Sequence, residues 1–82
     1  MFLFKVQGRF MITGIGLVLL PGLGNKNAKV NDKIKIIRPD GSIIDAKIKG
    51  IIFNQNCDIS VGNDLTKDDV PIGSEVWLNE QQ

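Results

Sequence analysis

The chain has 82 residues, the size of one small domain, which leaves no room for a second folded unit or for a catalytic barrel of ~250 residues. Ten Lys and Arg against nine Asp and Glu give a net charge of +1, and 43% of the residues are apolar, so the chain is neither disordered nor a polycation. The sequence contains no His, which removes the commonest general base and the commonest metal ligand. We therefore expect no enzymatic activity, no metal and no cofactor.

The cysteine content and the apolar segments indicate a cytoplasmic protein. Cys57 is the single cysteine of the sequence, so an internal disulfide is excluded and a reducing compartment is favoured. Residues 11–24 (MITGIGLVLLPGLG) follow Lys5 and Arg9 in the manner of a signal peptide, but glycines interrupt the run and no small-x-small cleavage site follows. The run is also shorter than the ~20 apolar residues of a membrane span. We expect neither a signal peptide nor a membrane segment.

The N-terminal third shows the two-residue period of half-buried strands. In the first segment this period points Phe2, Phe4 and Val6 to the same side of a strand. Residues 13–16 (TGIG) can bend or bulge between two further strands, and residues 21–29 form a loop rich in Gly and Asn. No stretch in this part of the chain has the apolar stripe of a helix.

The middle of the chain predicts an antiparallel hairpin. Apolar and polar residues alternate in two segments, 34–37 and 42–53. Isoleucine occupies inner positions of both, where its branched side chain suits a pleated surface. Residues 38–42 (RPDGS) join them in a turn that has Pro at its first central position and Gly41 for a positive φ. Asn31 lies in the turn before this hairpin, since Asn tolerates the left-handed conformation.

The last third predicts two further strands, at residues 59–62 and 75–78. Between them, residues 65–70 (LTKDDV) suit a single turn of helix that is stopped by a proline and solvated or capped by its two aspartates. Alternation in the final strand sends Trp77 outward and its two neighbours inward. Short strands with turns about every ten residues predict an all-β fold, a small Greek-key β-barrel that spans residues 1–82 as one domain.

Three motifs occur in the order and with nearly the spacing of the second domain of translational GTPases such as elongation factor Tu. Residues 10–18 (FMITGIGLV) resemble the family's F-x-I-x-G-x-G-x-V, residues 28–36 (AKVNDKIKI) resemble I-K-V-G-D-x-V-x-I, and residues 65–76 (LTKDDVPIGSEV) resemble I-x-x-x-D-I-x-x-G-x-V. The resemblance covers most of the chain. It implies a Greek-key β-barrel and a non-catalytic binding module whose partner is RNA or the ribosome.

Departures from the family pattern limit what the resemblance implies about function. The chain has no GxxxxGK[ST] phosphate loop, Ile15 stands where the family has Arg, and residues 54–58 (NQNCD) replace a Gly-rich segment. The fold is therefore implied, whereas the residues that hold a tRNA end are not. Five turn positions are expected to be required structurally, and these are Gly14, Gly16, Asn31, Gly41 and Gly73.

A basic stripe is the first candidate binding surface. Residues 26–49 carry seven basic and three acidic residues, whereas residues 50–82 carry one basic and six acidic residues. Two adjacent predicted strands carry Lys33, Lys35, Lys47 and Lys49. If these side chains share the outer face, they form a basic stripe suited to the phosphates of RNA. The alternative is a solvated sheet face whose lysines protect an edge strand, and no aromatic residue is expected among them.

An apolar patch around Trp77 is the second candidate surface. An outward Trp is typical of interface hot spots, and the expected protein contact comprises Trp77, Phe53 and Ile43. The alternative is that Trp77 covers an open end of the barrel. The basic middle and acidic end of the chain also favour pairing of two copies into a homo-oligomer. Two functions thus remain open: RNA binding, and a small regulatory or inhibitory protein-contact module without a nucleic-acid role.

Overall fold

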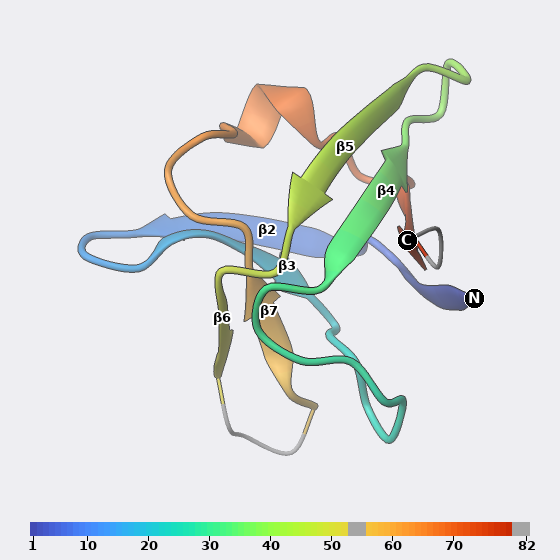
Figure 1. The fold of residues 1–82 in the computed structure, drawn as a ribbon. Coiled ribbons are helices and arrows are strands. Elements are labelled where there is room, and N and C mark those ends of the chain that lie inside the picture. The colour runs from blue at the N-terminus through green and yellow to red at the C-terminus, as the bar shows by residue number, and fades with distance from the viewer. Residues whose placement is uncertain (53–55, 80–82) are drawn as a thin grey trace.

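A computed structural model describes residues 1–52 and 56–79 of the chain (Figure 1). Within these ranges the chain forms eight strands and one short 3-10 helix: β1 (Phe2–Lys5), β2 (Gly8–Ile12), β3 (Gly16–Leu20), β4 (Lys33–Ile37), β5 (Ile43–Lys47), β6 (Gly50–Ile52), β7 (Asp58–Ser60), η1 (Lys67–Asp69) and β8 (Glu75–Leu78). The predicted all-β class is confirmed. No helix in the described part of the chain has the length and apolar character needed to cross a membrane.

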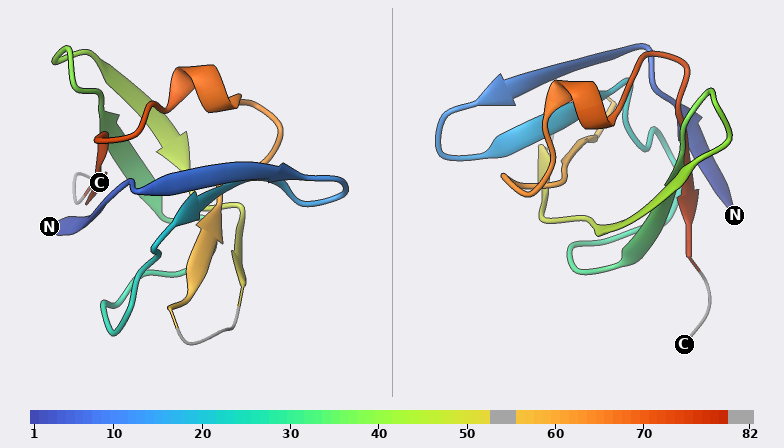
Figure 2. Two further views of the ribbon diagram at one scale, coloured as in Figure 1. Left: turned by 180° about the vertical axis from the view of Figure 1, so that it is seen from behind. Right: turned by 90° about the horizontal axis from the view of Figure 1, so that it is seen from above.

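The strands form two antiparallel sheets, with the orders β1-β8-β4-β5 and β2-β3-β7-β6. The chain passes between the sheets four times, at two tight corners, from β1 into β2 through Val6 and from β5 into β6 through Ile48, and along the longer β3–β4 and β7–β8 connections (Figures 1 and 2). Backbone bonding continues at both corners, since the Val6 N–H donates to the Ser74 carbonyl at 2.7 Å and the Lys49 N–H donates to the Ser60 carbonyl at 2.8 Å. The result is a barrel-like body in which no ladder closes among the described residues.

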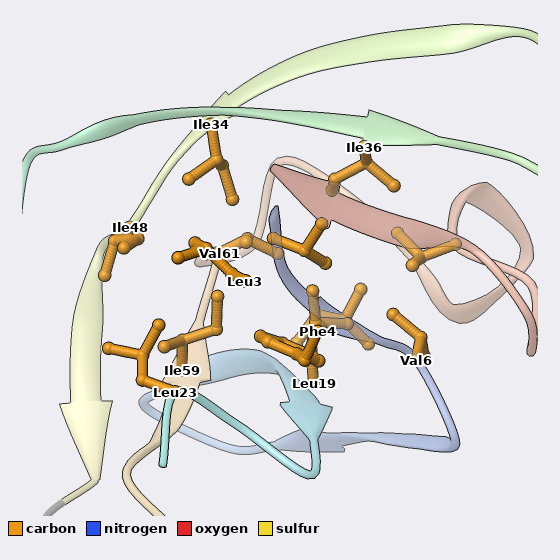
Figure 3. Packing of buried hydrophobic residues seen from close by; sticks show 13 residues of the cluster. Leu3, Phe4, Val6, Leu19, Leu23, Ile34, Ile36, Ile48, Ile59 and Val61 are labelled. Atoms are coloured by element: carbon orange, nitrogen blue, oxygen red, sulfur yellow. The ribbon is translucent and has the colours of Figure 1, made fainter. Parts of the chain in front are cut away.

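The hydrophobic core fills the space between the two sheets (Figure 3). Alternation along the central strand β4 buries Ile34 and Ile36 completely, as the two-residue period predicts. The loop after β3 adds Leu23, a core residue that alternation did not identify because it lies outside any strand. The buried cluster comprises Leu3, Phe4, Val6, Leu17, Leu19, Leu23, Ile34, Ile36, Ile48, Ile59, Val61, Val70 and Val76.

The first strand departs from the predicted alternation. Phe4 and Val6 are buried as expected, but Phe2 is 37% exposed and Leu3 is buried in its place. The pairing of β1 with β8 is irregular between Phe2 and Phe4, and a bulge of this kind turns one residue of a strand out of phase. The inward prediction for Phe2 was therefore wrong. Its ring lies on the solvent side of the sheet, next to β8.

The predicted central hairpin is present, with its second strand divided in two. Strands β4 and β5 pair from Lys33 opposite Lys47 to Ile37 opposite Ile43, and the turn between them is closed by a bond from the Arg38 N–H to the Ser42 carbonyl at 2.8 Å. The strand predicted over residues 42–53 is interrupted after β5, because the chain there crosses to the other sheet.

All five predicted turn positions lie at positive φ: Gly14 at 86°, Gly16 at 103°, Asn31 at 78°, Gly41 at 92° and Gly73 at 94°. The left-handed region is accessible to Gly and, with a smaller penalty than for other side chains, to Asn. The conformation expected from the residue types is thus observed at each position. The two glycines of the β2–β3 turn differ in the space available for a side chain. A Cβ added at Gly14 would have no atom within 4 Å, whereas a Cβ added at Gly16 would clash with the backbone of Gly62.

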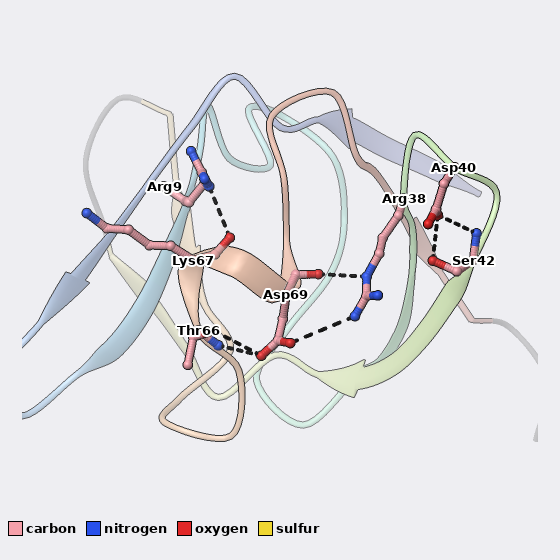
Figure 4. A network of polar contacts seen from close by, with 7 residues as sticks. All are labelled: Arg9, Arg38, Asp40, Ser42, Thr66, Lys67 and Asp69. Carbon is pink, nitrogen blue, oxygen red and sulfur yellow. Dashed lines mark hydrogen bonds and ion pairs between the residues drawn. The ribbon is translucent and has the colours of Figure 1, made fainter.

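A polar network ties η1 to both sheets (Figure 4). Arg9 on β2 donates from Nε to the Lys67 carbonyl at 3.3 Å, and Arg38 after β4 donates from Nε to the Asp69 carbonyl at 2.8 Å. Within the turn, Oδ2 of Asp69 accepts from the Thr66 N–H at 2.8 Å and from the Thr66 hydroxyl at 3.2 Å. The single helical turn predicted from the sequence is therefore held in place by capping and by two arginines.

Replacing Asp69 with Asn should destabilise the protein at neutral pH and matter less in acid. The Thr66 backbone N–H, then the Thr66 hydroxyl and nearby Arg38, hold the pKa of Asp69 below its ordinary value of 3.8. A lowered folded-state pKa means that the ionised carboxylate stabilises the fold above pH 3.8 and that this contribution is lost as pH falls through the folded-state pKa. Urea unfolding at pH 6, 4 and 3 measures the free energy of unfolding of the parent and of D69N. The difference between the two should become smaller as the pH falls.

The control for this prediction is Asp68→Asn. Asp68 belongs to the same turn and has the same charge, but its side chain makes no hydrogen bond within the described residues. The parent and D68N should therefore differ little in stability at each of these pH values. A gap between the parent and D69N that stays constant from pH 6 to pH 3 would contradict the role given to Asp69.

Candidate functional site

The solvent-facing side of the β1-β8-β4-β5 sheet, called the outer face below, carries residues from both candidate surfaces. Cross-strand register places Trp77 on β8 between Phe2 on β1 and Lys35 on β4. Lys35 in turn lies opposite Asp45 on β5. Since register partners point to the same side of a sheet, these four residues form one row across all four strands.

Trp77 is held in a defined orientation on this face. Its ring is half-buried and meets the Phe2 ring edge to face, with 5.4 Å between centroids and 71° between planes. The indole Nε1–H of Trp77 donates to Oε1 of Glu75 at 2.9 Å, and Glu75 lies two residues earlier on the same strand. Val76 lies between them and is fully buried, so Trp77 points outward, as the alternation of the strand predicts. The ring therefore lies on the outer face of the sheet, beside Phe2.

The four candidate lysines divide into two settings. Lys35 lies in the row with Trp77, whereas Lys33 and Lys47 lie directly opposite each other at the far end of the β4–β5 pair. Lys49 lies past the end of β5, with its Nζ 3.4 Å from Oδ2 of Asp64. Lys33, Lys47 and Lys49 line an open groove of about 500 Å³, together with Asp45 and Asp64.

The structure brings an aromatic residue among the lysines, where the sequence predicted none. Trp77 and Lys35 are register partners on neighbouring strands, although 42 positions separate them in the chain. Local alternation assigns Lys35 and Trp77 to the outer sides of their strands, but it does not say which strands become neighbours. The expectation that no aromatic residue lies on this face was wrong for this reason, and the two candidate surfaces are parts of one face.

The structure describes two of the three residues expected to form a protein contact, Trp77 and Ile43, and both lie on the outer face. Phe53 lies outside the described residues. Ile43 is 58% exposed on the outer face, but its register partner is Ile37, in the row next to that of Trp77 and two strands away from it. Phe2 is the residue that contacts Trp77, and sequence reasoning missed it because the bulge in β1 reverses its side.

No protein-family model, curated protein or solved structure matches the chain. The chemistry of the outer face is that of a binding surface: aromatic rings offer stacking, and lysines offer charge. A further cation lies beside the rings, since Nζ of Lys26 is 5.9 Å from the Phe2 ring centroid. Among the described residues, no group of three or more His, Cys, Asp or Glu side chains is arranged to hold a metal ion.

Proposed function

We propose that the protein is a non-catalytic RNA-binding module that holds a single strand on the outer face. The observation that carries the proposal is the position of Trp77 between Phe2 and Lys35 on an exposed sheet surface. Proteins that hold single strands combine aromatic platforms for the bases with basic side chains for the backbone. The motif resemblance to the second domain of translational GTPases supports RNA or the ribosome as the partner, and a cytoplasmic, translation-related role rests on that resemblance and on the single cysteine.

The geometry favours a single strand over a duplex. A sheet face presents stacking surfaces only to bases whose own faces are free, and a base pair within a helix is already stacked on both sides. The half-buried Trp77 leaves part of its ring accessible beside Phe2, and Lys35 lies one strand away, about 5 Å across the sheet. When a base stacks on Trp77, the phosphate of the same nucleotide is thus within reach of Lys35.

Trp77→Ala should weaken binding of a short oligouridine by about 5- to 150-fold, because base stacking on an aromatic side chain contributes about 1–3 kcal/mol. Trp77→Phe should retain most of the affinity, since a smaller aromatic face remains. Fluorescence anisotropy of a labelled oligonucleotide at low salt measures the affinities. In the parent, quenching of the single Trp of the chain reports contact at the site directly.

The matched control for the loss of an apolar side chain is Ile72→Ala. Ile72 is 51% exposed and lies in the turn before β8, outside the rows of the outer face. Its replacement should leave the affinity unchanged. A folded Trp77→Ala variant that binds RNA as tightly as the parent would rule out stacking at this position.

A protein contact without a nucleic-acid role is the second candidate function, as a small regulatory module or a homo-oligomer. It is favoured by exposed apolar side chains on the β2–β3 hairpin, where Phe10 and Met11 on opposite sides of the edge strand β2 and Ile15 in the turn are 39–45% exposed. Exposed edges with apolar side chains are common pairing sites. Salt separates the two candidates, because phosphate binding weakens steeply with salt and an apolar interface does not. Sedimentation at low and high salt tests for the oligomer.

A further inference from the structure

The groove at the end of the β4–β5 pair has a charge arrangement that stacking at Trp77 does not explain. Lys33 and Lys47 are direct cross-strand partners, and like charges opposite each other destabilise a sheet. In the part of the chain that the structure describes, neither ammonium lies within ion-pair distance of a carboxylate. Two lysines therefore lie side by side in the lining of an open groove.

The two carboxylates that line the groove are each placed beside another lysine. Asp64 pairs with Lys49 at 3.4 Å, and Asp45 is the register partner of Lys35. Both members of the Lys49–Asp64 pair are exposed, so the pair is weak and screened by salt. The groove lining thus contains three lysines and two carboxylates, and Lys33 and Lys47 are the two of these lysines that have no ion-pair partner among the described residues.

We propose that this groove is a phosphate subsite in which Lys33 and Lys47 together hold one backbone phosphate of a single strand. The inference rests on the proposed function, because the same strand places a base at Trp77. Strand β8, which carries Trp77, is two strand spacings from β5, which carries Lys47, or about 10 Å across the sheet. The subsite extends the bound segment from the aromatic rings across β4 to the groove, which Lys49 also lines.

The first test measures how RNA affinity depends on salt in Lys33→Gln/Lys47→Gln. Loss of one phosphate contact should lower the slope of log affinity against log salt by about 0.7 for a single strand, while quenching of Trp77 persists. Lys29→Gln/Lys67→Gln removes the same charge from exposed positions that do not line the groove, and it should leave the slope unchanged. Because the groove variant removes a like-charge pair, its thermal midpoint should equal or exceed that of the parent.

A second test uses inorganic pyrophosphate at millimolar concentration and follows the backbone amide signals of β4, β5 and Lys49 by NMR. Shifts confined to positions 33, 47 and 49, and lost in the groove variant, support the subsite. Failure of the two proposals can be told apart. RNA binding with an unchanged slope and no pyrophosphate shifts overturns the subsite and leaves the proposed function intact. Pyrophosphate shifts in a parent that binds no RNA overturn the RNA proposal, and the groove then stands as an anion site alone.

Discussion

Replacing Gly16 with Ala is expected to lower the free energy of unfolding by about 3 kcal/mol or more, a large share of the ~4–12 kcal/mol that a domain of this size possesses. At φ 103° the added Cβ would lie 2.6 Å from Cα of Gly62 and still closer to its carbonyl group. The two backbones cannot separate cheaply, because the Leu17 N–H donates to the Gly62 carbonyl at 2.8 Å and the buried Ser60 hydroxyl donates to the Ile15 carbonyl at 2.8 Å.

Gly14→Ala is the matched control for this clash. Gly14 has a similar positive φ of 86°, but a Cβ there would project into open space. Only the conformational penalty remains, about 1–2 kcal/mol. The urea midpoint of Gly16→Ala should therefore be well below that of Gly14→Ala. Equal midpoints would contradict the close approach of β3 to Gly62.

Ile36→Ala is expected to cost about 2–5 kcal/mol, the range for removing a large apolar side chain from a packed core. Ile36 has no exposed surface and lies in the middle of β4, flanked by Val76 on β8 and by Ile44 on β5. Neighbours on both sides are held by strand ladders, so they cannot move in to fill the cavity. The loss should appear as a lower thermal midpoint, by about 4–8 °C for each kcal/mol in a domain of this length.

The control for the core substitution is Ile43→Ala on the outer face of β5. Ile43 is 58% exposed, so its removal creates no cavity and should change stability by about 0.5 kcal/mol at most. The pair tests the two-residue period directly, since both residues are isoleucines on paired strands. Comparable losses in the two variants would mean that the inner and outer sides of this hairpin are wrongly assigned.

The shared outer face changes how variants of Trp77 are interpreted. The basic stripe and the Trp77 patch were expected to be separate surfaces that serve different functions, but register places Lys35 directly beside Trp77. Loss of Trp77 would therefore impair an RNA contact and a protein contact alike. The lysines discriminate better, because Lys35 and the groove pair Lys33 and Lys47 carry the salt dependence that only a phosphate contact requires.

Much of the local structure is readable from the sequence alone. The period of two placed Ile34, Ile36 and Val76 inside and Trp77 outside, and the structure agrees at each position. The turn chemistry of residues 38–42 predicted the β4–β5 hairpin, and the Gly and Asn residues marked the positions of positive φ. These features depend on interactions within a few residues: the alternation of a pleated strand, the fixed φ of Pro and the missing Cβ of Gly.

The candidate site, by contrast, was decided by tertiary structure. The bulge that turns Phe2 outward, the neighbours of β8 and the close approach of Gly16 to Gly62 all join segments at least 38 positions apart. Alternation states which side of a strand faces the core, but the choice of partner strand depends on how all the apolar residues are buried together. The row of Phe2, Trp77 and Lys35, and the opposition of Lys33 to Lys47, exist only because the common core sets that order and register.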